Sequence, residues 1–127
     1  QPVPETDAEL IRTILESLAL KYRRMVRRLA NIVPEMPSTL NIVGGGCQNK
    51  LLNQMTADAT GLLVEAGPIE ATAAGNVVAQ MIASGDIASL SEGREIIRRS
   101  FDLETHEPTA PSEWNAKAEL FEKILPS

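Results

Sequence analysis

Cysteine, histidine and aromatic side chains are scarce in this sequence of 127 residues. Cys47 is the only cysteine, which excludes an internal disulfide framework and fits a reducing, cytoplasmic setting. His106 is the only histidine, and no cysteine lies near it at a spacing suitable for binding a metal. We therefore expect His106 to be a solvated loop residue, and we predict no metal site built from side chains of this chain.

A net basic charge and long apolar runs are also lacking. The formal net charge is −5 at pH 7, whereas a dedicated nucleic-acid binder normally carries a basic footprint. No apolar run approaches the roughly 20 residues that a membrane-spanning helix needs. The residues Gln1 to Glu5 lack the charged and apolar regions of a secretory signal. We expect one globular piece that contacts neither nucleic acid nor a membrane.

A long amphipathic helix is predicted from Asp7 to about Ala30. Apolar residues recur there at helical spacing, and acids precede bases in the order that the helix dipole favours. The predicted stripe consists of Leu10, Ile11, Ile14, Leu15, Leu18, Tyr22, Met25, Val26 and Leu29. Pro34 and Pro37 break the pattern, so residues 31–38 should form a connecting loop.

Two strand-helix units follow this loop. The first combines a strand at Thr39–Val43, a glycine-rich turn and a helix from about Lys50 to Gly61. The second combines a strand at Leu62–Ala66 with a helix from about Ala71 to Gly85. This order predicts an α/β fold in which a right-handed crossover joins two parallel strands.

The rest of the chain predicts two more helices and no strand. A short helix should span Ser91 to Arg99, and a last amphipathic helix Glu113 to Ile124, with an irregular proline-bearing stretch at Asp102 to Pro111 between them. Two strands alone make an unsatisfactory sheet with exposed edges. We therefore expect further strands, upstream of Gln1, to complete the sheet.

The turn from Gly44 to Asn49 is the segment that suggests chemistry. It joins a predicted strand to a helix start, where backbone N–H groups and the helix dipole favour a bound phosphate. It matches neither standard phosphate motif, because Asn49 stands where a dinucleotide fingerprint has its third glycine and no Gly-Lys-Ser/Thr follows. By spacing alone, a tight structural turn explains these glycines better than a phosphate site.

Five segments in order carry a more specific signal: residues 1–6, 14–23, 41–49 (Asn-Ile-Val-Gly-Gly-Gly-Cys-Gln-Asn), 51–59 and 66–76. Together they resemble the C-terminal part of sugar kinases of the FGGY family. Within this family the likeness is greatest to the enzymes that phosphorylate L-rhamnulose. It covers about residues 1–105 closely and the tail more loosely, through the segment at Phe101 and the helix that carries Trp114.

The resemblance implies a piece of a two-domain kinase of the actin-like, ribonuclease-H-like superfamily. Residues 1–127 would be the distal portion of its C-terminal, ATP-binding domain. The implied reaction transfers the γ-phosphoryl group of ATP, with Mg²⁺ on the phosphates, to a ketose hydroxyl, in this branch the 1-hydroxyl of L-rhamnulose. L-fuculose, xylulose or another ketose stays open as the sugar, because the residues that select it lie outside this chain.

The same resemblance implies that the fragment is inactive by itself. Phosphoryl transfer of this kind needs a carboxylate that accepts the hydroxyl proton. In the family this base is an aspartate that would lie upstream of Gln1. The sugar-binding domain would also lie upstream of Gln1. Asp58 lies late in its predicted helix, away from the glycine turn, and receives no role. We predict no catalytic residue in this chain.

The family's glycine-rich adenosine motif falls on Gly44, Gly45 and Gly46, with Gly45 the best match to the glycine whose backbone contacts the nucleotide. Asn49 matches a polar residue that reaches the adenine or ribose side, and Gln48 is a weaker candidate on the same face. An asparagine amide both donates and accepts, so it can read a base edge or a hydroxyl. Alternatively, Asn49 can simply cap the helix. For Cys47, a small side chain in a crowded turn is a simpler explanation than nucleophilic chemistry.

A second class of function stays open at this point. The long first helix and an unpaired sheet edge are features of a non-enzymatic interaction or oligomerisation module, which would self-associate through that edge.

Overall fold

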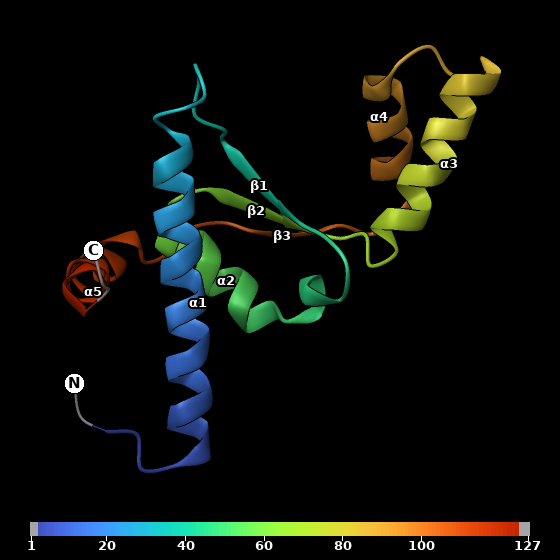
Figure 1. Cartoon of the computed structure of the whole chain (residues 1–127). Coiled ribbons are helices and arrows are strands. Elements are labelled where there is room, and N and C mark those ends of the chain that lie inside the picture. Colours follow the sequence, from blue (N-terminus) through green and yellow to red (C-terminus); the bar gives the residue numbers. More distant parts are fainter. Residues whose placement is uncertain (1–2, 125–127) are drawn as a thin grey trace.

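The computed structural model describes residues 3–124, in which helices flank a small mixed sheet (Figure 1). The elements in chain order are α1 (Asp7–Leu29), β1 (Thr39–Ile42), the short 3₁₀ helix η1 (Gly45–Gln48), α2 (Lys50–Thr60), β2 (Leu63–Ala66), α3 (Ala71–Ser84), α4 (Leu90–Ser100), β3 (Glu104–His106) and α5 (Pro111–Ile124). Each predicted helix and strand is present within one or two residues of its predicted bounds. Among the described residues no helix is both long and apolar enough to cross a bilayer.

The helix ends follow the residues that the sequence places there. Thr6 caps α1, because its hydroxyl accepts a hydrogen bond from the Glu9 N–H and the Glu9 carboxylate accepts one from the Thr6 N–H. Gly61 and Gly85 end α2 and α3 in the left-handed conformation, with φ of 74° and 83°. Glycine adopts this conformation without the Cβ penalty of other residues, so both ends were predictable.

The sheet contains three strands in the order β1-β2-β3. β1 and β2 are parallel, as predicted, with Thr39 opposite Leu63 and Ile42 opposite Ala66. β3 runs antiparallel to β2 and lies in the stretch that was predicted to be irregular. That prediction was wrong, because a strand of three residues, two of them exposed, has too few positions to show an alternating pattern.

His106 is buried in β3, and the prediction of a solvated loop residue was therefore wrong. Its exposed fraction is 8%, and it pairs with Val64 across the sheet. Its Nε2 lies 3.8 Å from a carboxylate oxygen of Glu104. The surrounding charged residues suggested solvent, but the missed strand places this side chain on the covered face.

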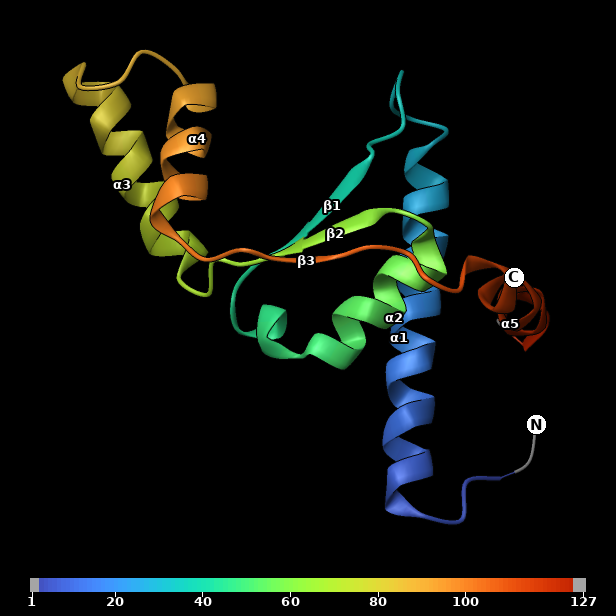
Figure 2. The same cartoon turned by 180° about the vertical axis from the view of Figure 1, so that it is seen from behind.

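The hydrophobic core lies between α1, α2 and α5. Its buried members are Ala19, Leu20, Met55, Ala59, Trp114 and Ala118. Figures 1 and 2 show α1 and α5 at one end of the sheet and α2 running from that end alongside the strands, while α3 and α4 project as a separate hairpin at the other end. Inside the hairpin the helices pack closely at Gly93, where a Cβ would collide with Val78.

α1 buries only one margin of its predicted apolar stripe, including Val26 and part of Leu15. The buried residues of α1 are Ala19, Leu20, Arg23 and Val26, which face α2 and α5. Six residues of the predicted stripe are exposed: Leu10, Ile11, Ile14, Tyr22, Met25 and Leu29. Periodicity shows that a helix has an apolar face but does not show what covers it. Within residues 3–124 only α2 and α5 pack extensively on α1, and both lie on the side of this buried margin.

Arg23 joins the three core helices. Its Nη1 donates to the Ala59 carbonyl oxygen at 2.9 Å, and its Nη2 donates to Asn115 Oδ1 at 2.6 Å. Burial, and next the neighbouring charge of Arg27, lower the pKa of Arg23 from its ordinary value. The two hydrogen bonds offset part of the desolvation penalty of this buried cation.

Asp58 anchors the segment between β3 and α5 on α2. Its Oδ1 accepts hydrogen bonds from the N–H groups of Thr109 and Ala110, at 2.6 and 3.2 Å, and from the side chains of Gln54 and Thr109. Burial raises the pKa of Asp58, but these hydrogen bonds outweigh burial and hold the pKa below its ordinary value. The carboxylate therefore has a structural role that its position in the sequence does not indicate.

Replacing Asp58 by alanine should lower the free energy of unfolding by about 2 kcal/mol at pH 7, because four hydrogen bonds to a buried charge are lost. Since the pKa is lower in the folded state, the carboxylate stabilises the fold above pH 3.8 and loses this contribution as the pH falls below that value. Urea unfolding between pH 7 and pH 3 measures both effects. If the free energy of unfolding of Asp58→Ala depended on pH in the same way as that of the parent chain, the structural role of this carboxylate would be contradicted. Glu95→Ala, in an exposed ion pair, is the control and should change stability little.

Candidate functional site

The glycine turn lies at the carboxyl ends of the two parallel strands. Gly44 lies two residues after the end of β1, and its N–H donates to the Pro68 carbonyl oxygen at 3.1 Å. The Gly67 N–H donates back to the Ile42 carbonyl oxygen at 2.8 Å. These two bonds tie the turn after β1 to the loop after β2. In open α/β sheets this edge is where ligands bind.

The turn itself is a short 3₁₀ segment and not a direct entry into α2. Gly44 has a φ of 75°, a conformation that favours glycine. The Cys47 N–H then donates to the Gly44 carbonyl oxygen, and the Asn49 N–H to the Gly46 carbonyl oxygen. Cys47 is buried, which fits the simpler reading of a small side chain in a confined position. The backbone of the turn is thus ordered by its own hydrogen bonds.

The fold does not require glycine at positions 45 and 46. Neither residue has a positive φ, and a Cβ at either position would meet no atom within 4 Å. Both residues are exposed. An ordinary side chain would fit these positions in the described structure, yet it would cover the backbone of the turn. Two such glycines leave the space beside their backbone open for a ligand.

Asn49 caps α2, which was one of its two predicted roles. Its Oδ1 accepts a hydrogen bond from the Leu52 N–H at 3.0 Å. Capping employs the carbonyl oxygen, whereas the amide nitrogen is a donor that the cap does not need. Asn49 and Gln48 are both exposed at the same end of α2. The cap and a contact to a bound molecule are therefore compatible.

A cavity of about 570 Å³ adjoins the turn. This volume lies in the usual range for small-molecule sites. Its lining comes from three separate segments: Cys47, Gln48 and Lys50 beside the turn, residues 66–70 after β2, and Phe101, Asp102 and Glu104 before and within β3. The last three were missed by the sequence prediction. They lie more than 50 residues from the turn, and only the unpredicted pairing of β3 with β2 brings them there.

The charge of this cavity is mainly negative. Glu70, Asp102 and Glu104 contribute carboxylates, and Lys50 contributes the one positive charge among the lining residues. Lys50 Nζ lies 3.0 Å from Glu104 Oε2, so this charge is already paired. Such a cavity suits an uncharged group such as a nucleoside better than a triphosphate, because like charges repel.

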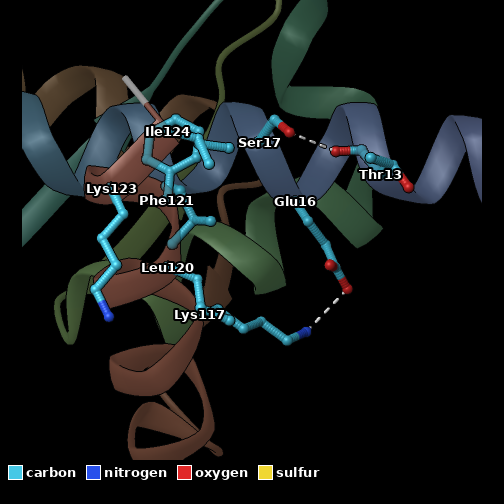
Figure 3. A pocket seen from close by; sticks show the side chains of 9 residues that line it. Thr13, Glu16, Ser17, Lys117, Leu120, Phe121, Lys123 and Ile124 are labelled. Carbon is cyan, nitrogen blue, oxygen red and sulfur yellow. Dashed lines mark hydrogen bonds and ion pairs between the residues drawn. The ribbon is translucent and has the colours of Figure 1, made fainter. Parts of the chain in front are cut away.

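A second cavity lies between α1 and α5 (Figure 3). Leu20, Leu120, Phe121 and Ile124 line it, and Lys117 Nζ pairs with Glu16 Oε1 at 2.9 Å at its rim. Burial raises the pKa of Glu16, but Lys117 and Arg12 outweigh it and hold the pKa below its ordinary value. Its volume of about 210 Å³ is smaller than that of most small-molecule sites. None of the predicted site residues lines it.

The fold and the turn define a class of protein. A parallel strand pair with a helix after each strand, and a glycine turn at the carboxyl end of the first strand, form part of an actin-like, ribonuclease-H-like α/β domain. Residues 1–84 match the C-terminal domain of the FGGY family of carbohydrate kinases. The chain belongs to this family, as the segments at residues 41–49 and 66–76 predicted.

Two relatives in the family are similar over most of this chain. A rhamnulokinase from Klebsiella pneumoniae subsp. pneumoniae is 50% identical over 113 residues, which cover 89% of this chain and 23% of the relative. A rhamnulokinase from Bacteroides thetaiotaomicron is 45% identical over 116 residues, which cover 91% of this chain and 24% of the relative. The chain therefore spans about a quarter of the length of these relatives.

Single glycine substitutions should separate the demands of the fold from those of a ligand. Gly44→Ala should destabilise the chain by about 1–3 kcal/mol, because its φ of 75° and ψ of −168° strain a residue with a Cβ. Gly45→Ala and Gly46→Ala should change the free energy of unfolding by less than about 0.5 kcal/mol, as exposed substitutions in open space do.

Urea unfolding of the three variants measures these differences. Gly75→Ala is the matched control, since it adds a methyl group in open space inside the helix α3, far from the turn. It should stabilise the chain by up to about 1 kcal/mol. Losses at positions 45 and 46 as large as the loss at position 44 would mean that the fold itself needs these glycines.

Proposed function

We propose that this chain is the distal ATP-binding portion of a cytoplasmic carbohydrate kinase that transfers the γ-phosphoryl group of ATP to a ketose hydroxyl. The 45–50% identity to two rhamnulokinases supports L-rhamnulose as the sugar and L-rhamnulose 1-phosphate as the product. In this proposal residues 1–127 belong to the C-terminal domain, and Mg²⁺ enters with the phosphates of ATP. The sugar and the catalytic base are held by other parts of the full-length protein.

The observation that carries the proposal is the open backbone at Gly45 and Gly46. The fold tolerates a side chain at both positions, and yet both are glycine. A ligand that lies against this backbone explains why. The cavity beside the turn offers the adjoining space, with Gln48 at its wall and the exposed Asn49 next in sequence. Gly44, Gly45, Gly46, Gln48 and Asn49 form the proposed nucleotide contact.

The charges of the cavity suggest how the nucleotide is oriented. The adenosine end fits beside the turn, where carboxylates outnumber the lysine. The triphosphate then extends away from Glu70, Asp102 and Glu104 and toward the rest of the kinase. Such transfer depends mostly on positioning and on stabilising charge, so the task of this chain is to hold the nucleotide in one orientation.

The proton-accepting carboxylate of the reaction is assigned outside this chain. Asp58 is the buried carboxylate nearest to the site in sequence, but its Oδ1 is bound by Thr109, Ala110 and Gln54. A general base must reach the proton that it removes. A carboxylate that anchors the segment before α5 is poorly suited to this role. The chain alone should accordingly bind nucleotide without transferring phosphate.

A second candidate function is self-association, favoured by one observation. Six large apolar side chains of α1 are exposed, and β1 is an edge strand of the described sheet. A second copy of the chain is the occupant that this reading requires. In a longer protein the preceding part of the domain would cover the same surface. The kinase proposal therefore expects no self-association through this surface once that part is present, whereas the self-association function expects it to persist.

A chimeric enzyme tests the kinase proposal. In it, this chain replaces the matched segment of the Klebsiella pneumoniae relative, and the ATP-dependent phosphorylation of L-rhamnulose is measured. The chimera should be active and the chain alone inactive. Gly45→Val should reduce kcat/KM at least about tenfold through a higher KM for ATP, because the added side chain covers the contacted backbone. Gly75→Ala should leave the kinetics unchanged.

Two outcomes would count against this proposal. One is a folded chimera, judged by circular dichroism and thermal unfolding, that lacks activity. The other is an active chimera whose KM for ATP does not respond to Gly45→Val. A chain that forms stable dimers, together with an inactive chimera that also dimerises, would favour the self-association function.

A further inference from the structure

Asn53 is a buried polar residue in the second turn of α2, with an exposed fraction of 0%. Its Nδ2 donates to the Cys47 carbonyl oxygen at 2.7 Å. Cys47 belongs to η1, so this bond joins the side of α2 to the glycine turn that precedes the helix. Among the described residues, it is the only hydrogen bond between a side chain and η1.

The orientation of the Asn53 amide is fixed by this contact. A carbonyl oxygen only accepts, so the amide nitrogen must face Cys47 and the amide oxygen must face away. The Oδ1 atom is buried and has no hydrogen-bond partner among the described residues. An unpaired buried acceptor destabilises a fold. A leucine of similar size would avoid this penalty, so the asparagine is not explained by core packing alone.

The glycine turn depends on such an anchor because residues 44–46 have no side chains of their own. Its β1 end is held by the bond between Gly44 and Pro68. Its α2 end is held by the bond from Asn53 to Cys47. The backbone of Gly45 and Gly46 lies between these two points.

We propose that Asn53 is a positioning residue of the nucleotide site. Its side-chain amide holds the Cys47 carbonyl, and thereby presents the backbone of Gly45 and Gly46 to the adenosine in one fixed arrangement. Asn53 is fully buried and acts through the turn without touching the nucleotide. This inference rests on the proposed nucleotide-binding function and adds to it the group that sets the shape of the site.

Hydrogen exchange of the chain tests the anchor without any ligand. In Asn53→Leu, the Cys47 and Asn49 N–H groups, whose bonds close the turn, should exchange at least about tenfold faster. Amides of β2 should keep their exchange rates. Asn53→Ala removes the same donor without adding volume and serves as the second variant if leucine disturbs the packing.

Thr56→Val is the matched control. Thr56 is also 0% exposed on α2, but its hydroxyl donates to the Leu52 carbonyl oxygen within the same helix. This substitution removes a buried hydrogen bond from α2 and leaves the anchor of the turn intact. Exchange at Cys47 and Asn49 should therefore be unchanged in Thr56→Val.

Kinetics in the chimeric enzyme then test the effect on the nucleotide. Asn53→Leu and Asn53→Ala should raise the KM for ATP at least about fivefold with kcat nearly unchanged, since the binding surface is disordered while the reacting groups are not. The KM for the sugar should not change. Thr56→Val should alter neither constant.

The possible results separate this inference from the function on which it rests. Unchanged exchange at Cys47 and Asn49 in both Asn53 variants would overturn the anchor, whatever the KM for ATP does. Faster exchange with an unchanged KM for ATP would overturn the role of the turn in nucleotide binding, and with it the proposed site. Faster exchange together with a higher KM for ATP supports both.

Discussion

The burial of α2 is the constraint on which the rest of this structure depends. Met55 and Ala59 pack against α1 and α5, and the small side chains of Ala57 and Ala59 let neighbouring elements approach closely. The first turns of α2 hold the glycine turn through Asn49 and Asn53, while Gln54 and Asp58 hold residues 107–110. One helix thus holds both the glycine turn and the segment that directly follows β3, the strand whose Glu104 lines the cavity.

Local chemistry explains why much of the fold could be predicted from the sequence. Gly61 and Gly85 end their helices because they adopt a positive φ, and Pro34 and Pro37 mark a loop because proline breaks a helix. The parallel pair follows from two strand-helix units in succession. For the candidate site, the helix cap at Asn49 was one of the two roles predicted from the sequence, whereas the nucleotide contact at residues 44–49 stays a prediction.

Other features depend on contacts between distant residues and were not predictable from local pattern. β3, the burial of His106 and the cavity wall at Phe101 and Asp102 all follow from one strand pairing across about 40 residues. The exposed stripe of α1 has a different cause. Its apolar face was correctly recognised, but within residues 3–124 Ile11 and Ile14 stay more than half exposed. In relatives about four times longer, further chain is available to cover such a face.

In the proposed function a nucleotide lies against the backbone of Gly45 and Gly46. The most direct measurement is a crystal structure of the chimeric enzyme with Mg²⁺ and a non-hydrolysable ATP analogue. The adenosine should contact Gly45 and Gly46, beside the cavity that Gln48 lines, with the phosphates directed away from Asp102 and Glu104. A nucleotide bound elsewhere, with the turn open to solvent, would contradict the proposed function.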